Sequence, residues 1–114
     1  MRIDARLPVR FGMLADVREG DAVLLPVGAA VPGGVPAAWL LSVPAAVPEH
    51  PAGCTCCLPR NPAAQALGDL FLRRGRGEVG AFRSVLAVVS PDQAGQVRAA
   101  LAADPLVSGR YRLA

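Results

Sequence analysis

One stretch decides the fold of this 114-residue chain: Ser84-Val85-Leu86-Ala87-Val88-Val89. A continuous apolar run rich in valine, without polar alternation, is typical of a strand buried on both faces of a parallel sheet. Ser90-Pro91-Asp92 follows directly and offers an N-cap and a proline at the first helical position. We therefore expect a central strand over 83–89 and then a helix over 91–103, which Asp104-Pro105 ends.

A second helix is predicted before this strand, over Pro62 to Arg74. Asn61 is a good N-cap and Pro62 a good first helical residue. The apolar residues of the segment follow the i, i+3, i+4 spacing of one helical face: Ala63, Ala66, Leu67, Leu70 and Phe71. Gly75 and Gly77 are stop signals at its end.

The first half of the chain is predicted to hold strands and turns. Ala22 to Val27 and Ala37 to Val43 are short apolar runs, separated by a loop that contains Gly33-Gly34. Because this loop is too short for a crossover helix, we expect the two runs to pair antiparallel as a β-hairpin. Residues 9–13 indicate a weak edge strand, and 107–113 indicate a strand that closes the sheet.

The predicted fold class is therefore α/β, a small and mainly parallel sheet with flanking helices plus an N-terminal β-hairpin. The length suits one small domain, 1–114, with a β-rich N-terminal part over 1–46 and a second part over 47–114. A hydrophobic fraction of 53% with 18% charged residues argues against disorder, while 11 prolines and 12 glycines indicate many turns.

The charge pattern and the apolar segments exclude several classes of protein. The net charge of +3 comes from arginine alone, since the chain has no lysine, and no basic patch with interleaved aromatic residues indicates nucleic-acid binding. The first twenty residues lack the apolar segment of a signal peptide, and prolines break the apolar stretch 23–47. We therefore expect a cytoplasmic protein with reduced thiols and no membrane span.

All three cysteines fall within one short stretch, Gly53-Cys54-Thr55-Cys56-Cys57-Leu58-Pro59-Arg60. A single tight turn can aim three thiols so spaced at one point, and thiolates are the ligands that zinc and cuprous copper prefer. The N-terminal end of the following helix, together with Arg60, favours the thiolate form. The sequence therefore predicts a metal site at Cys54, Cys56 and Cys57 for zinc or another thiophilic ion such as cuprous copper.

Structural zinc is nearly always four-coordinate, so the three thiolates need a further ligand. His50 is the only histidine and lies four residues before Cys54, which makes it the candidate within the chain. Glu49, a water molecule or a cysteine of a second chain would also serve. Two other interpretations stay open: Cys54 and Cys57 form a Cys-x-x-Cys pair at a helix N-terminus, as in thiol–disulfide redox sites, or the cysteines are an unused remnant.

The motif also resembles that of a known family. Gly53-Cys54-Thr55-Cys56-Cys57 followed by Arg60 is similar to the Gly-Cys-x-Cys-Cys metal motif of the CobW-like P-loop GTPases and metallochaperones. Asp104-Pro105-Leu106 and Arg110-Tyr111-Arg112-Leu113 are similar to the segment that closes that unit, so the likeness covers residues 47–114. The resemblance implies a partial P-loop-NTPase-like unit that binds metal, with a client metalloprotein or a second copy of the chain as partner.

The nucleotide-binding motifs of that family are missing. Walker A and the guanine-specifying Asn-Lys-x-Asp motif both need lysine, which this chain lacks. Val88-Val89-Ser90-Pro91 stands where the resemblance implies an acidic residue and a glycine. We therefore expect a thiolate metal-binding protein that is not an enzyme and has no GTPase activity; the alternatives are a non-catalytic structural or interaction protein, as a degenerate family remnant, or a redox-active thiol protein.

Overall fold

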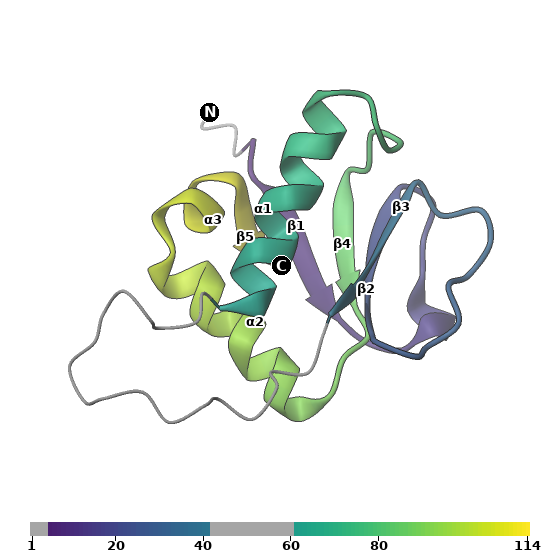
Figure 1. The fold of residues 1–114 in the computed structure, drawn as a ribbon, viewed down its shortest axis with the longest axis horizontal. Helices are drawn as coiled ribbons and strands as arrows, with labels where there is room; N and C mark the ends of the chain where they lie inside the picture. Colours follow the sequence, from purple (N-terminus) through teal and green to yellow (C-terminus); the bar gives the residue numbers. More distant parts are fainter. Residues whose placement is uncertain (1–4, 42–60) are drawn as a thin grey trace.

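Strand β4 (Ser84–Ala87) lies at the centre of a five-stranded sheet (Figure 1). The structure, a computed structural model, describes residues 5–41 and 61–114. The strand order is β3-β2-β4-β1-β5, and each of these neighbouring pairs is parallel. The other strands are β1 (Leu7–Phe11), β2 (Asp21–Pro26), β3 (Ala37–Leu41) and β5 (Tyr111–Leu113). The expected α/β fold with a mainly parallel sheet is confirmed.

The middle of the apolar run that decides the fold is buried on both of its faces. Val85 stands opposite Val9 of β1 on one side and Ala22 of β2 on the other. Val85 and Leu86, whose side chains point to opposite faces, are both 0% exposed. The strand itself ends at Ala87, earlier than the sequence indicated, and the amide of Val88 then donates a hydrogen bond of 2.9 Å to the carbonyl of Leu24.

In the described residues, three α-helices accompany the sheet: α1 (Pro62–Gly75), α2 (Pro91–Ala103) and α3 (Pro105–Arg110), besides a short 3-10 turn, η1 (Leu14–Asp16). The two predicted helices, 62–74 and 91–103, are confirmed. Ser90 and Gln93 begin α2 with a reciprocal capping box, each side chain accepting a hydrogen bond of 3.2 Å from the other's amide. Asp104 ends α2 and caps α3, because its side chain accepts hydrogen bonds from the amides of Leu106 and Val107.

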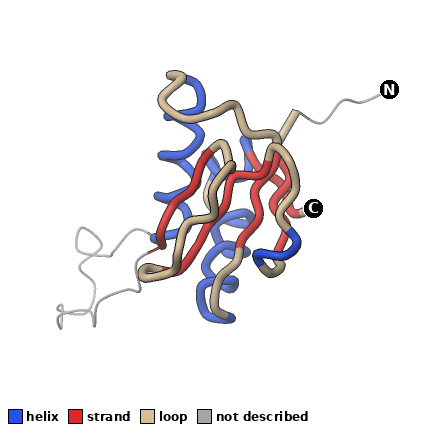
Figure 2. Tube along the Cα trace, turned by 90° about the vertical axis from the view of Figure 1, so that its right-hand side faces the viewer, coloured by secondary structure: helices blue, strands red, loops and turns tan. Residues whose placement is uncertain are grey.

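The three α-helices contact one another and form one layer against the sheet (Figures 1 and 2). The core between the layers combines alternate strand residues with the apolar faces of the helices, chiefly Val9, Leu24, Leu67, Leu70, Phe82, Val85, Val97 and Tyr111. The hydroxyl of Tyr111 is buried there and donates a hydrogen bond of 2.7 Å to the carbonyl of Leu67. Within the described ranges, no helix is both long and apolar enough to cross a membrane.

The opposite face of the sheet carries no described α-helix. Val23, Leu25 and Leu86 are nonetheless buried, and they lie outside the main core cluster because alternate residues of a strand point to opposite faces. Arg10 and Asp21 lie on this second face as well, and they form the polar site described below.

The predicted N-terminal β-hairpin is wrong. β2 and β3 are neighbours, but they run parallel, with Ala22 opposite Ala37 and Pro26 opposite Leu41. The connection 27–36 needs no helix to return to the start of the sheet, because an extended chain of that length spans about 33 Å whereas a five-residue strand is only about 17 Å long. Gly28, at φ 95°, turns the chain just after β2, where the amide of Ala29 bonds the carbonyl of Pro26 at 3.1 Å.

The first and last strands also differ from their predictions. Residues 9–13 were expected at an edge, but β1 spans Leu7–Phe11 and lies inside the sheet, between β4 and β5. The closing strand predicted over 107–113 is divided into α3 and the three-residue β5. The Asp104 cap and Pro105 begin another helical turn there, which leaves only Tyr111–Leu113 to pair with β1.

Candidate functional site

The predicted metal ligands Cys54, Cys56, Cys57 and His50 lie outside the described residues. The same holds for the alternative redox pair, Cys54 and Cys57. Within 5–41 and 61–114, no group of three or more histidine, cysteine, aspartate or glutamate side chains could hold a metal ion.

The two residues that border the segment 42–60 are both fixed to α2. Nε2 of Gln93 donates a hydrogen bond of 3.4 Å to the carbonyl of Leu41, the last residue of β3. Nδ2 of Asn61, the N-cap of α1, donates one of 2.9 Å to the carbonyl of Gln96. Residues three apart on a helix are neighbours, so both ends of the segment are held at one place on α2.

That place is the carboxyl edge of the sheet. β3 ends there, and α1 and α2 begin there, as crossover helices after parallel strands do. In open α/β sheets, ligands bind outside the carboxyl ends of the strands, at the point where successive connections leave in opposite directions. Here the connection from β1 to β2 passes across β4, and the connection from β4 to β5 passes across β1, so the two cross at the centre of the sheet.

Asn61 also sets the electrostatics at the start of α1. Its Oδ1 accepts hydrogen bonds from the amides of Ala63 at 2.9 Å and Ala64 at 3.4 Å. The first turn of α1 contains no acidic residue, so the partial positive charge of the helix N-terminus is not offset within the helix. A thiolate or another anion near this terminus would be stabilised.

Replacing Asn61 by Ala is expected to lower the free energy of unfolding by about 1–2 kcal/mol, since a helix cap and the bond to α2 are both lost. Asn61→Ser keeps an acceptor for the cap but cannot reach the carbonyl of Gln96, so we expect a smaller loss. Urea unfolding followed by circular dichroism measures both. Equal stability of wild type and Asn61→Ala would show that this anchor contributes nothing.

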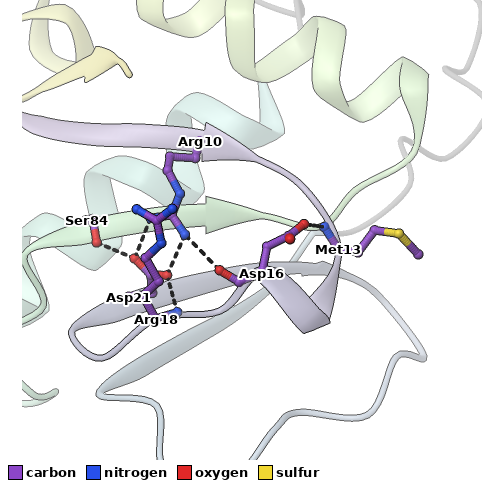
Figure 3. Close-up of polar contacts among 6 residues, drawn as sticks. All are labelled: Arg10, Met13, Asp16, Arg18, Asp21 and Ser84. Carbon is purple, nitrogen blue, oxygen red and sulfur yellow. Dashed lines mark hydrogen bonds and ion pairs between the residues drawn. The ribbon is translucent and has the colours of Figure 1, made fainter.

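A second polar site lies on the face of the sheet that carries no described α-helix (Figure 3). Arg10 of β1 reaches across β4 to Asp21 of β2, with Nη1 at 2.9 Å from Oδ1 and Nη2 at 2.8 Å from Oδ2. The carboxylate of Asp21 also accepts hydrogen bonds from the amide of Arg18, at 2.7 Å, and from the hydroxyl of Ser84. We call these four residues the Asp21 network.

The Asp21 carboxylate is fully hydrogen-bonded within the network and is not suited to proton transfer. Asp21 is 0% exposed, and both of its carboxylate oxygens already accept two hydrogen bonds each. Burial alone would raise the pKa of this carboxyl, but the hydrogen bonds from Arg10, Ser84 and the Arg18 amide, with the charge of Arg10, lower it below its usual value. An ionised and saturated carboxylate is a poor proton acceptor, so the network serves to join β1, β2 and β4.

A cavity of about 520 Å³ adjoins this network, and it is lined by Arg10, Phe11, Ala15, Asp16, Val17 and Arg18. Two of its charged side chains, Arg10 and Asp16, already bind other groups of the protein. Arg10 is bound to Asp21, and Oδ2 of Asp16 accepts a hydrogen bond of 2.8 Å from the amide of Met13. The cavity therefore indicates no class of ligand by itself.

Sequence reasoning missed the Asp21 network, because Arg18 to Asp21 reads as a turn. The sequence nevertheless holds one signal for this network, namely the positions at which its polar residues occur. Arg10, Asp21 and Ser84 each stand inside or at the start of an apolar run that becomes a strand, where a polar side chain needs a partner. Which residues pair depends on the strand order, and the sequence does not show that order.

Comparison with known proteins yields no match: no family model, no curated protein and no solved structure is similar to this chain. The resemblance to the CobW-like family thus rests on the cysteine motif and the C-terminal segment alone.

Proposed function

We propose that this protein binds one thiophilic metal ion, zinc or cuprous copper, through Cys54, Cys56 and Cys57. His50 is the proposed fourth ligand within the chain. In this proposal the protein is not an enzyme and does not hydrolyse a nucleotide, since it has no lysine to contact phosphates. It acts as a metal carrier or store in a reducing compartment, with a client metalloprotein or a second copy of the chain as partner.

The observation that supports this proposal most is the anchoring of the cysteine-bearing segment. Both of its borders, Leu41 and Asn61, are hydrogen-bonded to α2 at the carboxyl edge of the sheet. Closing the ends of a segment reduces the conformational entropy that its ligands lose when they gather around an ion. The uncompensated N-terminus of α1 also favours the negative charge that thiolate ligation requires.

Cobalt titration of the reduced, full-length protein tests the proposal. We expect intense thiolate-to-metal charge-transfer bands with tetrahedral d–d absorption, and displacement of cobalt by zinc. Each single Cys→Ser change is expected to weaken binding at least about tenfold, equal to about 1.4 kcal/mol. His50→Ala should weaken it less, because water replaces an imidazole more readily than a thiolate.

Thr55→Ser is the matched control, because it alters the same stretch and removes no thiol. It should bind cobalt as the wild type does. If wild type binds cobalt and zinc no better than the triple Cys→Ser variant, the metal proposal fails. A reversible Cys54–Cys57 disulfide in that case would favour the redox function, and its absence the structural or interaction protein.

A further inference from the structure

A second cavity, of about 400 Å³, lies between α2 and β5, the strand at one side of the sheet. We call it the arginine pocket, and its lining residues are Arg6, Arg98, Leu101, Ala102, Tyr111, Arg112 and Leu113. β5 is the last strand in the order, so no described strand covers its outer side. None of its described lining residues belongs to the anchors of Leu41 and Asn61, which are hydrogen-bonded to Gln93 and Gln96 of α2.

The charged side chains that line the described part of this pocket are all positive. Its three arginines come from three parts of the chain: Arg6 precedes β1, Arg98 belongs to α2 and Arg112 to β5. None of the lining residues that the structure describes is acidic. A guanidinium offers a planar fork of donors that matches the oxygens of a carboxylate or phosphate group, so the pocket suits an anion.

Arg98 is the arginine best placed to bind a ligand. Its guanidinium lies 4.5 Å from the centre of the Phe11 ring, a cation–π contact that holds the side chain in place. No residue of the described part of the chain accepts a hydrogen bond from it. Arg6 and Arg112 take part in other interactions as well, among them a bond of 3.5 Å from Arg6 to the carbonyl of Ser108.

The rest of the lining is apolar. Leu101 and Ala102 come from the side of α2, and Leu113 of β5 is 54% exposed. A ligand with an apolar body would cover these side chains and remove their surface from water. The volume falls within the range of small-molecule sites, which combine an apolar lining with a few charged groups that fix orientation.

We propose that the arginine pocket binds a small organic anion whose carboxylate or phosphate group pairs with Arg98 and whose apolar part rests on Leu101 and Leu113. Self-association of two such edges is disfavoured, because it would bring the arginines of both copies together. This proposal does not rest on the proposed function, because it is argued from other residues.

Nuclear magnetic resonance titration of the ¹⁵N-labelled full chain tests this site, with phenyl phosphate, inorganic phosphate and benzyl alcohol as probes. Phenyl phosphate should give saturable shifts at the amides of Arg98, Leu101, Ala102 and Leu113. Inorganic phosphate lacks the apolar part and benzyl alcohol the charge, so each should bind at least about tenfold more weakly. No saturable response to phenyl phosphate, or an equal response to inorganic phosphate, would overturn the proposal.

Two variants test where the ligand binds, and a third serves as their control. Arg98→Gln should weaken phenyl phosphate binding about tenfold or more, because a charge-assisted pair is lost. Ala102→Glu places a carboxylate in the pocket at an exposed helical position and should abolish binding without unfolding the chain. Arg76→Gln removes the same charge at the exposed end of α1 and should leave affinity unchanged. If Arg98→Gln and Arg76→Gln lost affinity equally, the effect would come from the net charge of the protein alone, and the site would be refuted.

Discussion

Asp21→Asn is expected to lower the free energy of unfolding by about 3–5 kcal/mol. The carboxylate is 0% exposed and accepts hydrogen bonds from the side chains of Arg10 and Ser84 and from the amide of Arg18. An asparagine of the same shape offers one acceptor oxygen, and its amide group would point donors at other donors. Arg10 would then remain half-buried without its counter-ion.

This loss is large for a chain of 114 residues, since domains of this size are stable by about 5–15 kcal/mol. Urea unfolding followed by circular dichroism measures the difference. Asp69→Asn is the matched control, because it makes the same chemical change on α1, outside any described ion pair, and should alter stability by less than about 0.5 kcal/mol. An unchanged unfolding midpoint in Asp21→Asn would show that the network does not join the strands.

The contribution of Asp21 to stability should decrease when the pH is lowered into the acid range. Its pKa is lower in the folded chain than in the unfolded chain, so the carboxylate stabilises the fold fully above the ordinary aspartate pKa of about 3.9. This contribution is lost as the pH falls below that value and through the folded pKa. The stability difference between wild type and Asp21→Asn should therefore be constant near neutral pH and shrink in acid.

The helices could be predicted from the sequence because their signals are local. Asn61-Pro62 and Ser90-Pro91 each place a cap and a proline at the first turn, and these pairs begin α1 and α2 in the structure. The run that forms β4 was evident because five apolar residues in succession follow Ser84. In each case the residues that decide the element lie within it.

The orientation of β2 and β3 could not be obtained in this way. Both strands were visible, but their parallel pairing depends on a loop, 27–36, that crosses back without a helix. β1 was equally obscure, because Arg10 interrupts its apolar pattern. The residue is acceptable inside the sheet only because β2 lies two strands away and supplies Asp21, and that neighbour is a property of the tertiary fold.

The two candidate sites also differ in whether their signal is local in the sequence or arises from the tertiary fold. Three cysteines within four positions are a local pattern, so the metal-site prediction needed no structure, and it remains a prediction because those residues lie outside the described ranges. The arginine pocket has no local pattern, since Arg6, Arg98 and Arg112 are far apart in the chain. Only the packing of α2 against β5 brings them to one cavity.

Val85→Asp is expected to unfold the protein. Val85 is 0% exposed, lies in the central strand and stands between Val9 and Ala22 in the two neighbouring strands. None of its register partners carries a charge, so a carboxylate there would be buried without a counter-ion. That burial costs several kcal/mol, in addition to the lost packing of the valine.

Val88→Asp provides the matched comparison, because it introduces the same group three residues later in the same apolar run. Val88 lies beyond the end of β4 and is only half-buried, so its carboxylate can reach water at the carboxyl edge. We expect this variant to fold with a stability loss of about 1–3 kcal/mol, whereas Val85→Asp should show no cooperative thermal transition. Equal behaviour of the two variants would contradict the position of β4, since it would place both residues in the same environment, as a strand running to Val89 would do.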